Sequence, residues 1–305
     1  MEMAATKENT IFIMAGGFGR EGIINEGYKV FKPYIEHNLF DRILREICFR
    51  LIFLPNEIWY NKKLRKESPK YVIITDPLIT ADYLKWIKKQ FPDAQLIVTY
   101  GNMVGRAKHV LPDQVSKGYR IWTFDNGDSK KYNIRLYHTN AYYPNWVKPK
   151  LEPEYDVFFV GCDKGRGEYL TQLESKLREK GLKTKFIITA DGRFKKRKSY
   201  YQKGIPYTEV INNIIRSKAI LNVAMEGQQG MTIRDMESMF FGVKLITTNP
   251  NTVNMDFYHP ENVYILKGME IEGIPDFLED DVVDVSEEIK RRHTLEKYIE
   301  EITQS

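Results

Sequence analysis

The chain has 305 residues, of which 42% are hydrophobic and 29% are charged, a composition typical of a globular protein with a substantial core. Two cysteines, Cys48 and Cys162, are too few for a disulfide-stapled fold, and no stretch approaches the roughly 20 apolar residues that a membrane-spanning helix needs. The net charge of +5 favours anionic partners, such as a nucleoside diphosphate, a lipid-linked diphosphate or an anionic lipid. Because residues 1–9 are polar and charged, unlike a secretory leader, we expect a cytoplasmic protein, with contact to the inner face of the membrane left open.

Short runs of β-branched and aromatic residues alternate with amphipathic segments along the first half of the chain. Strands are predicted at residues 10–14, 71–75, 95–99 and 120–124, and helical patterns at residues 28–45, 79–90 and 114–117. Strands that alternate with helices indicate βαβ units, and hence a parallel sheet with helices on both faces.

The second half repeats this alternation. Strands are predicted at residues 155–161, 184–189, 219–224, 244–248 and 263–266, and helices at residues 168–180, 208–217, 233–241 and 287–303. Between the halves, residues 141–154 contain three prolines, which disfavour regular structure and stiffen a connector. We therefore expect two Rossmann-like α/β domains, spanning residues 1–150 and 151–305.

The first motif is Gly17-Phe-Gly19-Arg-Glu-Gly22, which follows the first predicted strand and matches the dinucleotide-binding pattern G-x-G-x-x-G. Its context departs from that pattern, because Pro33 interrupts the presumed helix and no acidic residue closes a second strand about twenty residues on. A glycine-rich loop lining an interdomain cleft is favoured over a nicotinamide site. A plain turn is the simplest alternative.

The second motif begins with the loop 222–230, which leaves a predicted strand and leads into a predicted helix. Backbone N–H groups at the start of a helix favour anions. Arg234 and Glu237 are three positions apart and so lie on one helical face. A guanidinium suits a diphosphate and a carboxylate suits a ribose diol, so the pair predicts a nucleotide-diphosphate pocket. An exposed ion pair of little energetic value is the simpler alternative.

The same region resembles a known group of proteins. Thr-Ile-Arg-x-x-Glu at residues 232–237, followed by Gly-x-Lys-Leu-Ile-Thr-Thr-Asn at residues 242–249, resembles the donor-site signature of bacterial glycosyltransferases that build lipopolysaccharide and capsule. It is also similar to the spore-maturation glycosyltransferase-like group. Residues 122–132 and 155–166 resemble the stretches that end the N-terminal domain and open the C-terminal domain of such proteins. The likeness covers about residues 121–258.

The resemblance implies a GT-B fold, two Rossmann-like domains facing each other across a cleft, with the donor nucleotide on the C-terminal domain and the acceptor on the N-terminal domain. It implies that Glu237 binds the ribose hydroxyls and that Arg166 or Lys164 meets the diphosphate. Many relatives place a second acidic residue eight positions before the ribose carboxylate. Here the candidate for contact with the donor sugar is Glu226, which lies 11 positions before Glu237. The residues predicted to bind the donor nucleotide are Gly161, Lys164, Arg166, Gly230, Thr232, Arg234 and Glu237.

Glycosyl transfer requires stabilisation of the charge that develops on the leaving diphosphate, and the acceptor hydroxyl can need a general base. Asp76 and Glu21 are the candidate bases, because residues just past the carboxyl ends of strands line such clefts. Asp76 precedes Pro77, so capping of the next helix is its alternative role. The resemblance implies transfer without a bound metal, and the sequence holds no Asp-x-Asp motif and no His/Cys cluster with metal-ligand spacing. We therefore expect no metal and no cofactor, with the nucleotide-sugar as substrate.

The leading hypothesis is a metal-independent, hexosyltransferase-like glycosyltransferase that moves a sugar from a nucleotide-sugar to a surface-polysaccharide or lipid-linked saccharide. Peripheral contact with a membrane fits such an acceptor. The closing helix 287–303 is expected to pack back across the N-terminal domain, although dimerisation would suit its charges equally, so both monomer and homodimer stay open.

Two other function classes compete with this hypothesis. One is a non-catalytic nucleotide- or sugar-binding component of polysaccharide assembly, since no catalytic base stands out. The other is a nucleotide-dependent oxidoreductase that uses residues 17–22. Nucleic-acid binding is not expected, because the sequence contains neither a recognised domain motif nor a dense basic stripe.

Overall fold

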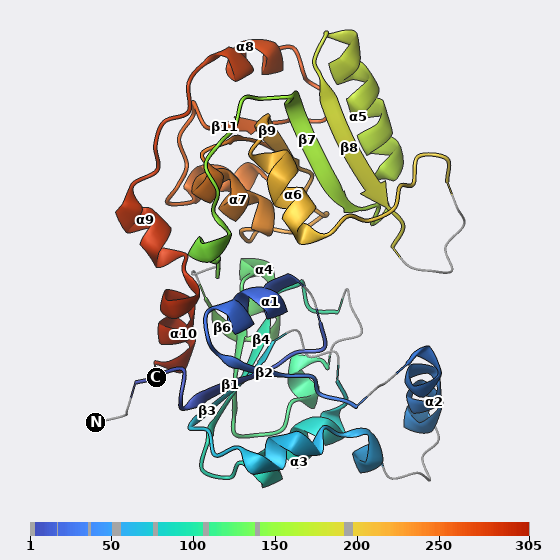
Figure 1. Cartoon of the computed structure of the whole chain (residues 1–305), viewed down its shortest axis with the longest axis vertical. Helices are drawn as coiled ribbons and strands as arrows, with labels where there is room; N and C mark the ends of the chain where they lie inside the picture. The colour runs from blue at the N-terminus through green and yellow to red at the C-terminus, as the bar shows by residue number, and fades with distance from the viewer. Residues whose placement is uncertain are drawn as a thin grey trace. The chain divides into compact units, whose positions relative to one another are not determined.

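The chain forms two compact α/β units, drawn in Figure 1. The computed structural model describes residues 4–16, 18–35, 38–50, 56–75, 79–105, 110–137, 141–191 and 198–304. Unit 1 comprises Met1–Tyr143 together with Leu295–Ser305, and unit 2 comprises Pro144–Thr294. The chain thus leaves unit 1 at Tyr143, ahead of the boundary expected at residue 150, and its last helix belongs to unit 1 again.

Among the described residues, unit 1 is built on a six-stranded sheet in which all neighbouring strands are parallel. Its strands, in their order across the sheet, are β2 (Lys29–Phe31), β1 (Thr10–Ile13), β3 (Tyr71–Thr75), β4 (Gln95–Tyr100), β5 (Tyr119–Thr123) and β6 (Arg135–Leu136). All four residues of β1 are buried, as expected for a strand covered on both faces. The apolar runs that predict β1, β3, β4 and β5 are confirmed as the centre of a parallel sheet.

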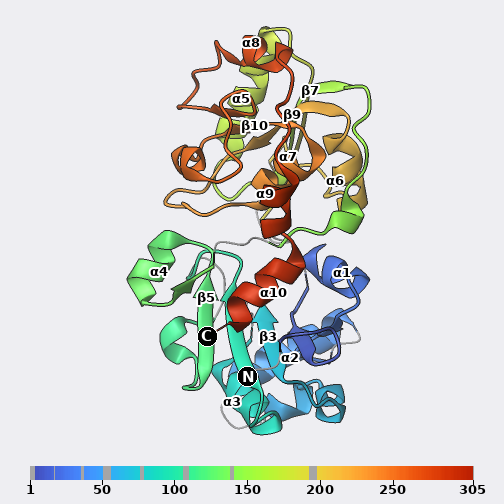
Figure 2. The same ribbon diagram turned by 90° about the vertical axis from the view of Figure 1, so that its left-hand side faces the viewer.

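Four helices pack against this sheet, namely α1 (Phe18–Asn25), α3 (Ala81–Gln90), α4 (Asn126–Tyr132) and α10 (Leu295–Thr303), whereas α2 (Leu39–Arg50) packs against the 3₁₀ helix η1 (Asn56–Trp59). The other 3₁₀ helices of the unit are η2 (Lys62–Lys66) and η3 (Pro112–Gln114). The start of α3 is capped by Thr80, whose Oγ1 accepts a hydrogen bond from Tyr83 N at 3.2 Å. Figure 2 shows α10 lying across the sheet, where Arg120 donates to the Thr303 carbonyl at 3.0 Å.

Unit 2 has a five-stranded parallel sheet within the described residues. In order across the sheet its strands are β11 (Val263–Ile265), β10 (Lys244–Thr247), β9 (Ser217–Asn222), β7 (Tyr155–Cys162) and β8 (Thr184–Thr189). The helices are α5 (Gly167–Glu179), α6 (Tyr207–Ile214), α7 (Ile233–Phe241), α8 (Ile274–Glu279) and α9 (Glu287–Arg292), with the 3₁₀ helices η4 (Pro144–Trp146) and η5 (Pro250–Asn254). Of these, α5 packs on β8, α6 on β7 and β9, and α7 on β9 and β10.

The strand order has the same form in both sheets. Numbered along each unit the strands run 2-1-3-4-5, with a sixth strand added in unit 1. This is a doubly wound order, in which ligands bind beyond the carboxyl ends of the strands where the order reverses. The reversal lies between β1 and β3 in unit 1 and between β7 and β9 in unit 2. The expectation of two Rossmann-like α/β units is therefore confirmed.

The predicted helix at residues 28–45 is wrong. The stretch contains β2, which pairs with β1, and α2 begins only at Leu39. Gly27 has a left-handed φ of 91° just before β2, and Pro33 lacks a donor N–H, so neither residue supports a continuous helix. The single helix predicted at residues 287–303 is also wrong, because α9 belongs to unit 2 and α10 to unit 1.

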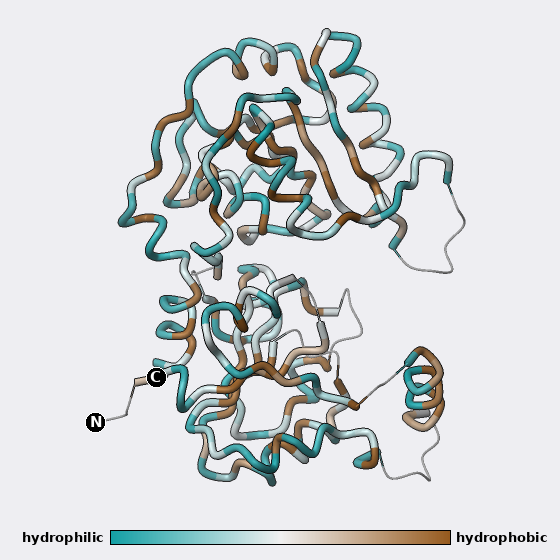
Figure 3. Tube along the Cα trace, in the orientation of Figure 1, coloured by the Kyte–Doolittle hydropathy of each residue, from teal (hydrophilic) through white to brown (hydrophobic). Residues whose placement is uncertain are grey.

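Each unit has its own apolar core. The core of unit 2 includes Val157, Phe159, Leu170, Ile188 and Leu221, and Figure 3 shows the apolar colouring along β7 and β8. Against this background the buried carboxyl groups of unit 2 stand out, since a buried charge is costly unless it is paired or hydrogen-bonded. No helix within the described ranges combines the length and the apolar content needed to cross a bilayer.

Candidate functional site

The carboxyl ends of β7 and β9 bring two loops together in unit 2. The two strands pair at the reversal of strand order, so the loops that follow them lie at the same edge of the sheet. The first loop leads into α5 and the second into α7, so both helices begin near this edge, where their N-terminal dipoles favour anions. The residues predicted to bind the donor all lie at the end of β7, in these two loops or at the start of α7.

Arg166 is the central cation of this edge. It is half-buried, its guanidinium lies 5.6 Å from the ring centroid of Phe159, and its Nε is buried without a hydrogen-bond partner. Within the described residues the structure shows no ion pair for this guanidinium. Burial lowers the pKa of Arg166, although a guanidinium stays protonated at neutral pH. Among its neighbours, Cys162 raises this pKa, the charge of Arg234 lowers it, and the carboxylates of Asp191 and Asp163 raise it by less. A cation held in this way has donors to offer to an anion.

Gly161 and Lys164 shape the loop around Arg166. A Cβ added at Gly161 would lie 3.2 Å from the Phe159 ring and 3.4 Å from Arg166 Nη2, so glycine leaves room for the stacked guanidinium. Lys164 has a left-handed φ of 48°, and its N–H donates to Asp191 Oδ1 at 2.6 Å. Of the two cations predicted to meet the diphosphate, Arg166 is thus partly enclosed and Lys164 is exposed.

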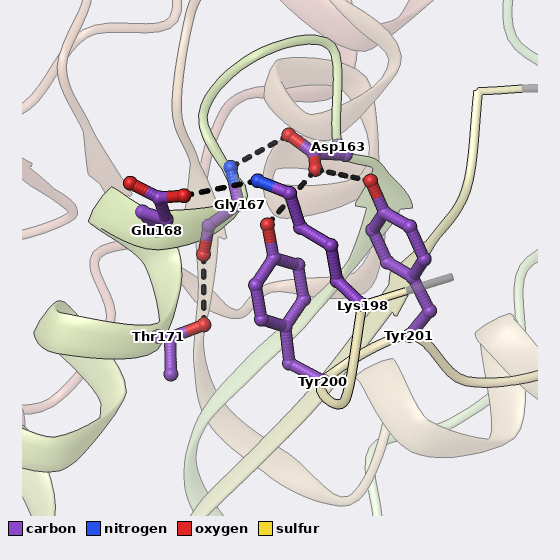
Figure 4. Close-up of polar contacts among 7 residues, drawn as sticks. All are labelled: Asp163, Gly167, Glu168, Thr171, Lys198, Tyr200 and Tyr201. Carbon is purple, nitrogen blue, oxygen red and sulfur yellow. Dashed lines mark hydrogen bonds and ion pairs between the residues drawn. The ribbon is translucent and has the colours of Figure 1, made fainter. Parts of the chain in front are cut away.

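Asp163 holds the start of α5. Its buried carboxylate accepts hydrogen bonds from Gly167 N at 2.7 Å, Tyr200 Oη at 3.1 Å and Tyr201 Oη at 2.6 Å, as Figure 4 shows. Burial alone would raise the pKa of Asp163, but the hydrogen bonds from Tyr201, Gly167 and Tyr200 bring that pKa below its ordinary value. The carboxylate therefore joins two tyrosines to the loop that carries Arg166.

Asp163 and its tyrosine partners are functional candidates that no sequence motif points to. Asp163 stands inside the stretch 155–166, and a short polar side chain just before a helix is a local signal for capping. Tyr200 and Tyr201 lie 37 and 38 residues further along the chain. No local pattern links residues at that separation, so only the fold reveals the cluster.

The start of α7 is a capping box. The backbone N–H and the hydroxyl of Thr232 both donate to Asp235 Oδ2 at 2.6 Å, and Thr232 Oγ1 accepts from Arg234 N at 3.1 Å. Asp235 is fully buried, and burial raises the pKa of Asp235 to about 6 in spite of these hydrogen bonds. The Thr232 hydroxyl is engaged in this cap, so in this structure its part is to hold the helix start.

Arg234 and Glu237 form an ion pair on α7. Arg234 Nη1 contacts Glu237 Oε2, and Tyr207 Oη donates to Glu237 Oε1 at 2.8 Å. The side chain of Glu237 is 0% exposed and that of Arg234 is 16% exposed, so the simpler expectation of an exposed pair is wrong. Burial raises the pKa of Glu237, and the charge of Arg234 and the hydrogen bond from Tyr207 offset only part of this rise. The Tyr207 ring in turn lies 4.8 Å from that of Trp146, between centroids.

The loop after β9 carries the remaining predicted residues. Glu226 is exposed, and Gly230 is half-buried just before the start of α7. Asn251 Nδ2 donates to the Gln229 carbonyl at 3.0 Å, which ties this loop to η5. The loop therefore presents an exposed carboxylate near the edge, while Glu237 lies beneath the surface.

In the glycine motif of unit 1, a tyrosine ring packs against two of the glycines. Gly17 lies outside the described residues, and Gly19 and Gly22 fall inside α1 instead of a loop. A Cβ added at Gly22 would lie 2.5 Å from the Tyr143 ring, and Tyr143 Oη donates to the Gly19 carbonyl at 3.1 Å. Close packing with Tyr143 thus accounts for both glycines, whereas a dinucleotide motif uses glycine for the approach of pyrophosphate.

The structure describes only one of the two candidate bases. Asp76 lies outside the described residues. Glu21 is exposed in the first turn of α1, the helix that follows β1. The structure bears only on the position of Glu21, and a catalytic role for either residue stays a prediction.

In the described part of the chain, no three His, Cys, Asp or Glu side chains gather in a way that could hold a metal ion. Transfer without a metal stays a prediction. The chain matches no protein-family model, and it matches no curated protein at a significant level.

Proposed function

We propose that this chain is a glycosyltransferase of the GT-B type that moves a sugar from a nucleotide-sugar to a surface-polysaccharide or lipid-linked saccharide. Two Rossmann-like units support the proposal, since the GT-B fold consists of two such domains. The resemblance at residues 232–237 and 242–249 supports donor binding in unit 2. The first stretch opens α7, the helix that follows β9 at the reversal of strand order, and the second contains β10, which pairs with β9.

The observation that carries the proposal is the state of Arg166. A half-buried guanidinium without an ion pair among the described residues is costly unless an anion satisfies it. Arg166 lies immediately before the first residue of α5, and Arg234 is near enough for its charge to lower the pKa of Arg166. Two guanidinium groups and a helix dipole together favour a diphosphate over a singly charged ligand.

In the proposed donor complex, the diphosphate binds Arg166 and Arg234 while Glu237 accepts hydrogen bonds from the ribose hydroxyls. Because Arg234 covers Glu237 in this structure, ribose binding requires the guanidinium to turn from the carboxylate towards the diphosphate. Tyr207, which donates to the other carboxylate oxygen, keeps Glu237 in place during that exchange.

The chemistry follows from this arrangement. The bond between the anomeric carbon and the diphosphate oxygen breaks, and the acceptor oxygen forms a new bond to that carbon. Negative charge grows on the leaving diphosphate, and the two guanidinium groups stabilise it. The resemblance assigns the acceptor to unit 1, where Glu21 or Asp76 would take the proton of the acceptor hydroxyl.

The proposal is tested by calorimetric titration of UDP, GDP, CMP, dTDP and NADH into the chain in the presence of a chelator. We expect one nucleoside diphosphate to bind, and Arg166→Ala to weaken its binding about tenfold or more, because charge-assisted hydrogen bonds are lost. The matched control is Lys164→Ala, which removes an exposed cation from the same loop and should have a smaller effect.

Catalysis is tested separately, by release of the nucleoside diphosphate from its sugar conjugates with and without a lipid-linked saccharide fraction. Acceptor-dependent release supports the transferase. Binding without any release would favour a non-catalytic nucleotide-binding component and contradict the enzymatic part of the proposal. Binding of NADH alone would contradict the donor site itself.

A further inference from the structure

The outer face of α2 concentrates exposed apolar side chains. Eleven large hydrophobic residues of the described chain are exposed, and five of them lie on this 12-residue helix. Their spacings of three and four positions place them on one face. In Figure 1 the helix lies at the margin of unit 1, and Figure 3 shows its apolar side. The five residues, with exposed fractions from 39% to 69%, are Leu39, Phe40, Ile43, Leu44 and Ile47.

The opposite face of α2 holds the helix to unit 1. The guanidinium of Arg45, a buried residue, lies 4.4 Å from the centroid of the Tyr34 ring, and it pairs with Glu46 at 2.7 Å. Cys48 is buried on the same side, and the Phe49 and Tyr34 rings are 5.2 Å apart. The outer apolar face is therefore not needed to anchor the helix.

Basic residues outnumber acidic ones on α2 and on the two short helices that follow it. The helix packs against η1, in which Ile58 is 55% exposed, and η2 follows two residues after η1 ends. Among the described side chains of α2, η1 and η2, six are basic and three are acidic. Those that are both basic and exposed are Arg42, Lys62, Lys63, Arg65 and Lys66.

We propose that α2, η1 and η2 form a docking surface for an anionic membrane. The apolar face of α2 enters the boundary between headgroups and acyl chains, and the basic residues of η2 lie against anionic headgroups. The charge balance favours lipid over a second copy of the chain, since a two-fold contact would bring two identical basic clusters together. The surface belongs to unit 1 and the candidate donor site to unit 2, so the two proposals stand on different residues.

The test is flotation of the full chain with vesicles of phosphatidylcholine alone and of phosphatidylcholine with about 30% phosphatidylglycerol. The test variant combines Phe40→Gln, Ile43→Gln and Ile47→Gln, all at exposed positions. We expect the unsubstituted chain to float with the anionic vesicles. The variant should bind them at least about tenfold more weakly, because the apolar area available for burial is lost. A matched control with unchanged binding carries glutamine at three exposed apolar residues elsewhere, Ile24, Leu151 and Val253.

A second variant, Lys62→Glu with Lys63→Glu, should lose binding to anionic vesicles while its thermal unfolding stays like that of the unsubstituted chain. Size-exclusion chromatography with light scattering measures the oligomeric state, and so tests whether a second copy of the chain occupies this face instead. Equal flotation of the chain and the α2 variant, or no flotation of either, would overturn the proposal. So would a dimer of the unsubstituted chain that the α2 substitutions convert to a monomer, because a second copy would then cover the face.

Discussion

Two buried carboxyl groups near the start of α7 differ in what donates to them. Asp235 accepts hydrogen bonds from the uncharged groups of Thr232 and Asn222, so burial dominates and raises the pKa of Asp235 to about 6. Glu237 has the cation of Arg234 beside it as well as the Tyr207 hydroxyl. The first carboxyl holds the helix start, and the second is the one that exchanges Arg234 for the ribose hydroxyls in the proposed donor complex.

The raised pKa of Asp235 predicts a pH effect on stability. Between pH about 4 and about 6 this carboxyl is protonated in the folded chain and ionised in the unfolded chain, so the folded chain binds the extra proton. Lowering the pH from 7 to 5 should therefore stabilise the fold through Asp235 by about 1 kcal/mol. The measurement is urea unfolding of the unsubstituted chain and of Asp235→Asn at both pH values. A difference between the two proteins that does not change with pH would contradict the prediction.

Glu237 should contribute more to the free energy of unfolding than an exposed glutamate does. Glu237→Ala leaves the largely buried Arg234 guanidinium without its carboxylate, so the free energy of unfolding should fall by about 3 kcal/mol. Glu237→Gln keeps an acceptor for the Tyr207 hydroxyl and should cost less. Denaturant unfolding compares these variants with the exposed control Glu226→Ala, for which we expect a change within about 0.5 kcal/mol. If Glu237→Ala behaved like the control, the pair would not be buried in solution.

At the scale of single elements, the loop from β7 to α5 depends on close approach of the backbone to side chains. A Cβ added at Gly167 would lie 2.5 Å from Tyr200 Oη and 2.7 Å from Asp163 Oδ2. Gly167 also donates its N–H to Asp163. The same few atoms thus hold the helix start and position the preceding residue, Arg166.

Gly167→Ala should disturb both functions of this loop. The added methyl group must displace Tyr200 or Asp163, so the free energy of unfolding should fall by roughly 1–3 kcal/mol. The affinity for the preferred nucleoside diphosphate should fall with it. Gly204→Ala is the control, since its Cβ would meet its nearest neighbour at 3.8 Å. Denaturant unfolding and calorimetric titration are carried out on both variants. Equal free energies of unfolding and equal affinities for the two variants would contradict the prediction, because the loop would then tolerate the added methyl group.

The elements differ in how far the sequence alone could predict them. Buried strands such as β3 and β4 were predictable, because a parallel sheet needs continuous apolar runs. The short strand β2 was not, because its three residues have no period of their own and only pairing with β1 defines them. In the candidate site, the spacing of Arg234 and Glu237 could be read from the sequence, but the burial of Glu237 comes from packing around it. Asp163 and its tyrosines meet only through the fold.

At the scale of the whole molecule, both units have the same doubly wound topology, but the residues at the reversal of strand order differ between them. In unit 2 the reversal of strand order carries two neighbouring guanidinium groups and two helix starts. In unit 1 two glycines of the motif after β1 pack against Tyr143. The difference supports a nucleotide in unit 2, and it leaves unit 1 for the acceptor in the proposed function.

The role of Arg166 in the donor site is tested with two ligands on two proteins. The preferred nucleoside diphosphate and its unphosphorylated nucleoside are titrated calorimetrically into the unsubstituted chain and into Arg166→Ala. We expect the substitution to weaken binding of the diphosphate about tenfold or more and to leave binding of the nucleoside unchanged, because Arg166 acts on the phosphate charge alone. Equal losses for both ligands, or no loss for the diphosphate, would contradict this expectation and remove Arg166 from the site.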